Sequence, residues 1–96
     1  MHALVGVFDM DCALFAEQVK TLKERIVPMV SQSPGFVAGY WSYDREKAKS
    51  HSYIVLTDEA TALKFSEQVR ANTAQSKSGV NVESLTVVEV LAEARK

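Results

Sequence analysis

The sequence SPGFVAGYWSYDREKAKSHSY, residues 33–53, holds the clearest structural signals in the chain. Pro34 fixes its own φ angle and restricts the residue before it, Ser33, while Gly35 tolerates a positive φ. Such a combination is typical of a turn between two elements. We therefore expect a helix to end before this turn and a strand to begin at Phe36.

The rest of this stretch predicts a β-hairpin. Residues 36–43 are mostly aromatic, β-branched or small, a composition that suits a strand with something packed on it. The charged residues 44–49 are expected to form a solvated loop, and a second strand should cover about residues 50–57. Because this stretch carries the only Trp and all three Tyr of the chain, we expect ligand chemistry here.

Toward the N-terminus, the pattern predicts a strand followed by a long helix. Residues 2–8 are apolar and rich in β-formers, and both faces of this strand look buried. Asp11 is placed to cap a helix that begins at Cys12. Pro28 lies inside the helical pattern, so the helix should kink there or restart as a short last turn. The apolar side of this amphipathic helix comprises Phe15, Val19, Leu22, Ile26 and Val30.

Toward the C-terminus, a second helix and a last strand complete the pattern. Asp58 is a candidate N-cap for a helix whose buried stripe would be Ala62, Phe65 and Val69. The polar residues 73–79 fit a loop, and residues 80–91 form a long β-rich strand. The chain has no internal repeat and no low-complexity linker, so we expect a single domain over residues 1–96.

Composition argues against several classes of protein. With 11 basic and 12 acidic residues the chain is almost neutral, which disfavours nucleic acid or an anionic membrane as the main partner. The longest apolar run is too short to cross a bilayer and follows no basic segment, so a cytoplasmic protein is expected. The single cysteine excludes an intramolecular disulfide. We interpret Cys12 as a small residue of a first helical turn, because a nucleophile would need a base partner.

The expected order of elements is β-α-β-β-α-β. This is the ferredoxin-like arrangement, an α+β fold in which an antiparallel sheet carries both helices on one face. The helices can cover only that face, yet the strands carry apolar or aromatic residues at both odd and even positions, which face opposite sides of the sheet. A second copy of the sheet is the simplest cover for the other face, so we expect a homodimer.

A hairpin centred near Lys47 would set the register of its two strands. Trp41 would then lie opposite Tyr53, and Tyr43 opposite His51. These four side chains would form an apolar surface with polar groups at their ends. A pocket between two sheets would have such a surface. The other face would carry the mostly aliphatic set expected under the helices: Phe36, Ala38, Tyr40, Ile54 and Leu56. A slip of one residue in the register would break this sorting into two faces.

Nearly the whole chain resembles the dimeric α+β barrel superfamily, and within it the small antibiotic-biosynthesis-monooxygenase-like proteins. The resemblance rests on the segments HALVGVF, VPMVSQSPGF, AGYWSYD, YIVLTDEATALKF and VESLTVVEV. Ser-Pro-Gly-Phe at residues 33–36 and Asp-Glu-Ala at residues 58–60 are its most recognisable parts. The resemblance implies a homodimer whose sheets close face to face into a barrel, with a cavity between sheet and helices or inside the barrel.

Superfamily members with known activity include cofactor-free monooxygenases acting on phenolic polyketides, and haem-degrading enzymes. Resemblance to the first group implies cofactor-free oxygenation of a small aromatic or enolisable compound. The catalytic residues would be His51 and Tyr43, and the substrate-binding residues Trp41 and Tyr53. The haem-degrading pattern needs an Asn on the first strand, a Trp on the third and a His on the second helix. This chain lacks all three, which argues against haem degradation, and we expect no cofactor.

Other roles for the same residues stay open. His51 could be a partly exposed rim residue instead of a general base, and Trp41 with Tyr53 could be packing or a dimer contact. His2 and His51 have no carboxylate cluster at metal-ligand spacing, so no metal site is expected. The alternative to an enzyme is a non-catalytic dimer that binds a small apolar molecule or stabilises a partner.

Overall fold

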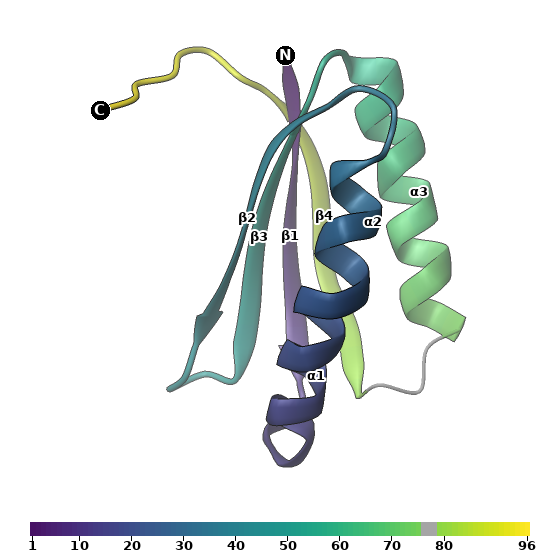
Figure 1. Ribbon diagram of the computed structural model, residues 1–96, viewed down its shortest axis with the longest axis vertical. Helices are drawn as coiled ribbons and strands as arrows, with labels where there is room; N and C mark the ends of the chain where they lie inside the picture. The colour runs from purple at the N-terminus through teal and green to yellow at the C-terminus, as the bar shows by residue number, and fades with distance from the viewer. Residues whose placement is uncertain (76–78) are drawn as a thin grey trace.

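One four-stranded antiparallel sheet is the frame of the molecule. The structure, a computed structural model, describes residues 1–75 and 79–96. The strands are β1 (His2–Met10), β2 (Phe36–Asp44), β3 (Lys49–Leu56) and β4 (Val80–Glu89). They lie in the order β2-β3-β1-β4, as Figure 1 shows.

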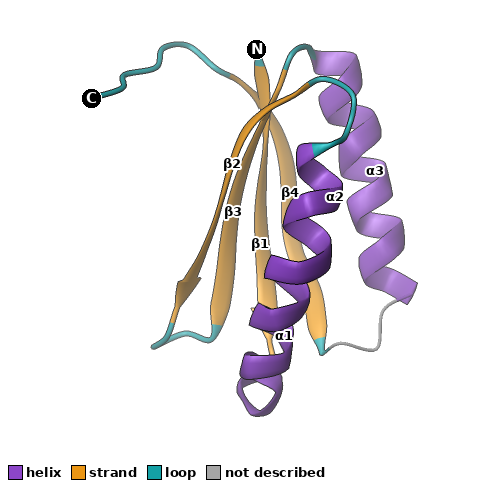
Figure 2. Cartoon of the chain, viewed as in Figure 1, coloured by secondary structure: helices purple, strands orange, loops and turns teal. Residues whose placement is uncertain are grey.

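Two helical segments cover one face of this sheet (Figure 2). The first runs through η1 (Cys12–Leu14), α1 (Phe15–Thr21), η2 (Leu22–Ile26) and α2 (Val27–Ser31), and the second is α3 (Glu59–Gln75). The predicted order of elements, with both helices on one face, is confirmed. The chain therefore has the ferredoxin-like α+β fold.

Pro28 explains why the first helical segment changes geometry. Proline has no N–H to donate to the carbonyl four residues earlier, so the regular α-helical ladder cannot continue through it. The preceding turn, η2, is π-helical, and α2 restarts with Pro28 in its first turn. The predicted short last turn is confirmed.

Aspartates begin both helical segments, as predicted. The Asp11 carboxylate accepts a hydrogen bond from the backbone N–H of Ala13 at 2.9 Å. The Asp58 carboxylate accepts one from the backbone N–H of Thr61 at 2.8 Å. Hydrogen bonds from Thr61 hold the pKa of Asp58 below its ordinary value. Each carboxylate satisfies an amide that the helix itself leaves without a partner.

Helix α3 is longer than the sequence predicted. It continues to Gln75, past Thr73, where the polar pattern suggested a loop. Thr73 Oγ1 donates a hydrogen bond to the carbonyl of Val69 at 2.8 Å, so this polar side chain is satisfied within the helix. The remainder of the expected loop, residues 76–78, lies outside the described residues.

The hydrophobic core lies between the sheet and the helices. Leu4 and Leu56 are 2% and 0% exposed, and burying such a side chain contributes about 1.5–3 kcal/mol. The other buried members of the core are Val30, Ile54, Ala62 and Phe65. Ala62 and Phe65 belong to the stripe predicted for α3.

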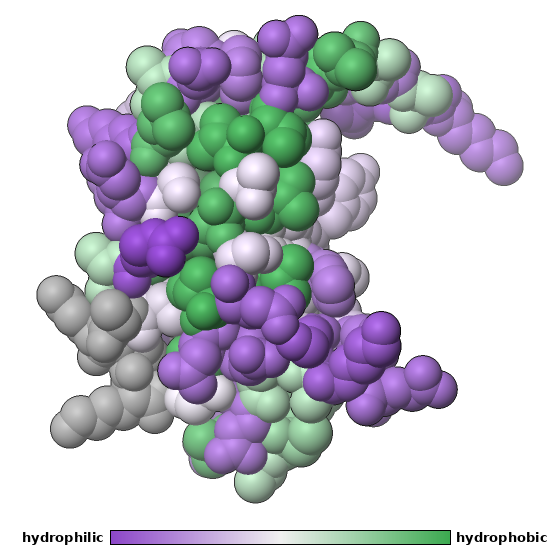
Figure 3. Space-filling model, turned by 180° about the vertical axis from the view of Figure 1, so that it is seen from behind, coloured by the Kyte–Doolittle hydropathy of each residue, from purple (hydrophilic) through white to green (hydrophobic). Residues whose placement is uncertain are grey.

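The opposite face of the sheet carries no helix of the described chain (Figure 1). We call it the open face. Figure 3 shows an apolar surface along its centre with polar residues around it. Tyr40 and Tyr53 are 70% and 39% exposed there. Its cross-strand rows are Ala38-Val55-Ala3-Val88, then Tyr40-Tyr53-Val5-Thr86, then Ser42-His51-Val7-Ser84.

Candidate functional site

The predicted pairing of Trp41 with Tyr53 and of Tyr43 with His51 is wrong. The two hairpin strands are offset from it by one residue, and the observed pairs are Tyr40-Tyr53, Trp41-Ser52, Ser42-His51 and Tyr43-Ser50. Because successive side chains of a strand point to opposite faces, Trp41 and Tyr43 face the helices while His51 and Tyr53 lie on the open face. Ala38 and Tyr40, expected under the helices, are on the open face as well. The four predicted site residues are therefore split between two sides of the sheet.

The length of the hairpin loop explains this offset. Asp44 pairs with Lys49, which leaves the four residues 45–48 between the strands. Asp44 Oδ1 accepts hydrogen bonds from the backbone N–H groups of Glu46 and Lys47 at 3.0 and 3.3 Å. Ala48 has a φ of 54°, a left-handed conformation that usually selects Gly or Asn. A loop centred on Lys47 would have an odd number of residues. The observed even number changes which side chains of β2 share a face with those of β3.

A cavity of about 350 Å³ lies between the sheet and the helices. Ligand pockets hold about 300–1,000 Å³ and are mostly apolar with a few polar groups, so this cavity suits a small ligand. Its floor is formed by Leu4, Phe8, Trp41, Tyr43, Ser50 and Ser52. Its helical side is formed by Phe15, Val19, Leu22, Ile26, Phe65 and Val69.

Small residues on the strands leave room for this cavity. Two cross-strand rows make its floor: Gly6-Ser52-Trp41 and Phe8-Ser50-Tyr43. A Cβ atom on Gly6 would lie 2.8 Å from both the Phe8 ring and Ser52 Oγ, so a side chain here would require its neighbours to shift. Gly6 thus permits the close approach of these two residues.

Tyr43 is held by neighbours from the start of the first helical segment. Its ring centroid lies 4.5 Å from that of Phe15, and the Arg45 guanidinium lies 5.5 Å from the Phe15 centroid. The Tyr43 hydroxyl is 3.7 Å from Cys12 Sγ, within hydrogen-bond distance for sulfur. This hydrogen bond raises the pKa of Tyr43, and burial adds to the effect. Tyr43 therefore keeps its proton at neutral pH and is available as a hydrogen-bond donor.

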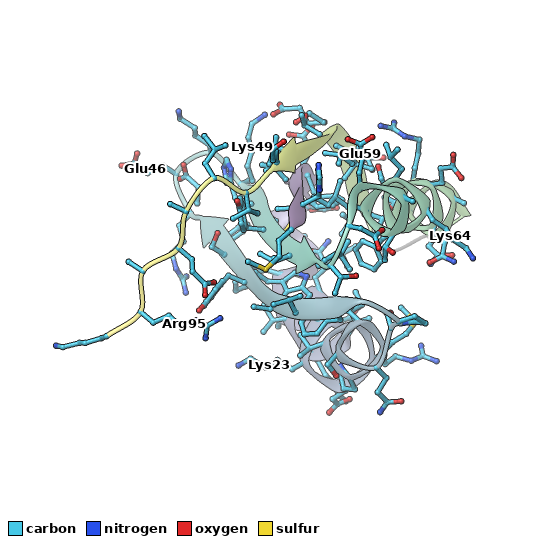
Figure 4. All side chains as sticks on the ribbon, turned by 90° about the horizontal axis from the view of Figure 1, so that it is seen from above. Lys23, Glu46, Lys49, Glu59, Lys64 and Arg95 are labelled. Carbon is cyan, nitrogen blue, oxygen red and sulfur yellow. The ribbon has the colours of Figure 1, made fainter. Side chains whose placement is uncertain are left out.

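Charged groups lie on both sides of the sheet, as Figure 4 shows for Lys23 and Lys49. Lys23 lines the cavity from η2. Lys49 lies on the open face, where its Nζ is 3.1 Å from Asp9 Oδ1 and also contacts Glu83. Hydrogen bonds to Glu83 and Asp9 raise the pKa of Lys49. This cluster is therefore separate from the cavity.

Phe15 and Ser52 line the cavity but have no site role in the sequence-based prediction. That prediction places Phe15 in the helix core and gives Ser52 no role. The sequence does contain a signal for Ser52. Ser52 lies between His51 and Tyr53 in the strand, so its side chain must point to the opposite face of the sheet. Only the correct register shows that this face carries the cavity.

Two further observations concern metal sites and membrane-spanning helices. Within residues 1–75 and 79–96, no group of three or more His, Cys, Asp or Glu side chains is arranged to hold a metal ion. In the same described residues, no helix is long and apolar enough to cross a membrane.

Comparisons with known proteins show what this fold is similar to. No family model matches the chain, and no curated protein matches it. Among solved structures, the chain is similar to the haem degrader MhuD from Mycobacterium tuberculosis, solved with two haems bound in its active site. The match has a TM-score of 0.72 and 14% identity, over 99% of this chain and 100% of that chain. The two chains share a fold. It is the ferredoxin-like α+β fold that the order of elements predicted.

The cavity residues do not fit a haem iron. His2 and His51 are both absent from the cavity lining, and α3 contains no His. Tyr43 and Met10 are lining residues of types that can bind iron. The Tyr43 hydroxyl interacts with Cys12 and keeps its proton, and Met10 lacks the His with which a Met ligand is paired. The donor set therefore gives no support for haem chemistry in this chain.

Proposed function

We propose that this single-domain protein is a homodimer that binds a small aromatic or enolisable compound in the cavity of each protomer and oxygenates it without a cofactor. The observation that carries the proposal is the apolar cavity floored by Trp41 and Tyr43. Such chemistry needs an apolar pocket and a few hydrogen-bonding groups, since the substrate itself supplies the electrons.

The proposed reaction requires only the substrate and dissolved O₂. An enolisable CH₂ group loses a proton to water, and the resulting enolate carbon bonds to O₂ and takes up a proton to form a hydroperoxide. Loss of water then leaves a ketone, so CH₂ and O₂ become C=O and H₂O. Tyr43 donates a hydrogen bond to the enolate oxygen, and Trp41 packs against the substrate ring.

Anthrone is a suitable probe, because it is flat, carries an enolisable CH₂ group and yields anthraquinone. We expect wild-type protein to accelerate O₂ uptake above the spontaneous rate. Tyr43→Phe should lower kcat about 100-fold, the effect of losing one hydrogen bond to a developing oxyanion. Tyr53→Phe makes the same change on the open face and should leave kcat unchanged. O₂ uptake at the spontaneous rate in wild-type protein would refute the oxygenase.

The sequence predicted His51 as a catalytic residue, but the proposal gives it no role in the cavity. From the open face, His51 can reach a ligand held between two sheets but not one in the cavity of its own protomer. His51→Ala should therefore turn over anthrone at the wild-type rate. Loss of activity in His51→Ala would indicate that the substrate binds between the two sheets, where His51 and Tyr53 would contact it.

The open face supports the proposed homodimer. No helix of the described chain covers its apolar rows, and Tyr40 and Tyr53 are 70% and 39% exposed there. A second sheet packed face to face would remove this exposed surface from water. Val55→Lys places a charge among these rows and should prevent assembly. Sedimentation velocity should show a wild-type dimer and a Val55→Lys monomer at micromolar concentration. A wild-type monomer would contradict the proposal.

A specific observation favours a second candidate, a dimer that binds a small apolar molecule without turnover. Among the described lining residues there is no carboxylate and no His to act as a base, and Tyr43 keeps its proton. Native mass spectrometry of the purified protein separates the candidates. A dimer with a retained ligand and no O₂ uptake would favour the binding protein.

A further inference from the structure

Two serines on β3 face the cavity with different hydrogen bonding. Ser50 and Ser52 are two residues apart on the same strand, and both line the cavity. Ser50 Oγ donates a hydrogen bond to the carbonyl oxygen of Ser42 at 3.2 Å. Ser52 is only 8% exposed, and its hydroxyl has no hydrogen-bond partner among the described residues. Ser52 Oγ is not one of the fully buried side-chain atoms without a partner, so it is open to the cavity and can hydrogen-bond a group that enters there.

The surroundings of Ser52 define the kind of partner. Its cross-strand neighbours are Gly6 on one side and Trp41 on the other. The Phe8 ring and Ser52 Oγ converge on the space beside Gly6, each 2.8 Å from where a Cβ would be. No charged side chain lies in this row, and Lys23, which also lines the cavity, belongs to η2 on the helical side. An ion placed beside Ser52 would lose its hydration without a counter-charge in the row. The group that meets Ser52 is therefore polar but uncharged.

We infer that Ser52 anchors a neutral oxygen atom of the ligand in this cavity, and so makes the cavity prefer an oxygen-bearing compound to the matching hydrocarbon. This inference rests on the proposed function, since it names a binding residue of the same cavity. Ser52 donates to a ketone or accepts from a hydroxyl.

A matched pair of probes tests this inference. 1-Tetralone and tetralin are bicyclic compounds of similar shape that differ in one ketone oxygen. Binding is followed by NMR titration of the Trp41 indole N–H and the Ser52 amide. We expect wild-type protein to bind 1-tetralone about 3- to 10-fold more tightly than tetralin, the effect of one neutral hydrogen bond. Ser52→Ala should bind both probes equally.

Ser50→Ala is the control variant. It removes a hydroxyl from the same strand and the same cavity, but that hydroxyl already has Ser42 as its partner. Ser50→Ala should keep the preference for 1-tetralone. A preference retained in Ser52→Ala would overturn the role of Ser52.

The probes also separate this inference from the proposed function. Equal binding of 1-tetralone and tetralin to wild-type protein would refute the Ser52 anchor and leave the ligand cavity in place. Failure of both probes to bind would refute the ligand cavity itself, and the anchor with it. Because the wild-type comparison needs no substitution, the result does not depend on how Ser52→Ala folds.

Discussion

The two faces of the sheet are built from alternating residues of the same strands, yet they differ in what covers them. On the helix face, Leu4 and Leu56 are 2% and 0% exposed beneath the helices, beside the cavity. On the open face, Tyr40 is 70% exposed. Val37, which a β-bulge between Phe36 and Ala38 places beside the open-face residues, is 39% exposed. When both the odd and the even positions of a strand are apolar, the two faces of the sheet can therefore have separate roles. One encloses a cavity that is proposed to bind a ligand, and the other is proposed to pair with a second sheet.

Removing a buried side chain from the helix face should have the largest effect. Leu56→Ala is expected to lower the free energy of unfolding by about 2–5 kcal/mol, through lost burial and the cavity left behind. Val37→Ala on the open face should lower it by no more than about 0.5 kcal/mol in the monomer. Urea denaturation at low protein concentration measures both. Equal losses would contradict the distinction between the faces.

Filling the cavity floor should have the next largest effect. Gly6→Ala forces a Cβ to within 2.8 Å of the Phe8 ring and Ser52 Oγ. Such overpacking is expected to cost about 1–3 kcal/mol and to weaken binding of 1-tetralone. Ser84→Ala, an exposed change on the open face, is the control and should do neither. Unchanged stability of Gly6→Ala would mean that the floor is not closely packed.

The charged end of the open face should contribute less and depend on pH. The pKa of Lys49 is raised in the folded protein by Glu83 and Asp9. Its ion pairs therefore stabilise fully at pH values below the ordinary lysine pKa, and the contribution is lost as the pH rises through the raised value. Lys49→Met should slightly lower the urea midpoint at about pH 8.

The same comparison at high pH tests the origin of that loss. Above about pH 11, the midpoints of wild-type protein and Lys49→Met should converge, since Lys49 is then becoming neutral. Lys20→Met, an exposed lysine on α1, is the control and should show no such pH dependence. A difference that persists at high pH would assign the loss to packing of the lysine stem instead of charge.

The smallest effect is expected in the hairpin loop that sets the two faces. Ala48→Gly removes the cost of a left-handed alanine, about 1–2 kcal/mol, but adds about 0.5–1 kcal/mol of backbone entropy. A net stabilisation of about 0.5 kcal/mol should follow in urea denaturation. Ala71→Gly inside α3 should instead destabilise by about 1 kcal/mol. A destabilised Ala48→Gly would argue against the positive φ.

Local signals were sufficient for the order of elements. Asp11 and Asp58 start helices because a carboxylate can bind free amides, and Pro28 interrupts one because it lacks an amide hydrogen. Gly35 has a φ of 79° in the turn before β2. Each of these effects acts over a few residues, so the sequence alone reveals it.

The sequence by itself determined the α+β order of elements, the helix starts and the presence of two apolar sheet faces. Only the tertiary structure decided which residues belong to which face. The loop 45–48 contains no Gly or Asn to reveal its length, and its conformation depends on Asp44 and a left-handed Ala48. The observed register differs by one residue from the predicted one. Because successive side chains of a strand point to opposite faces, this difference places Trp41 and Tyr43 on one face and His51 and Tyr53 on the other.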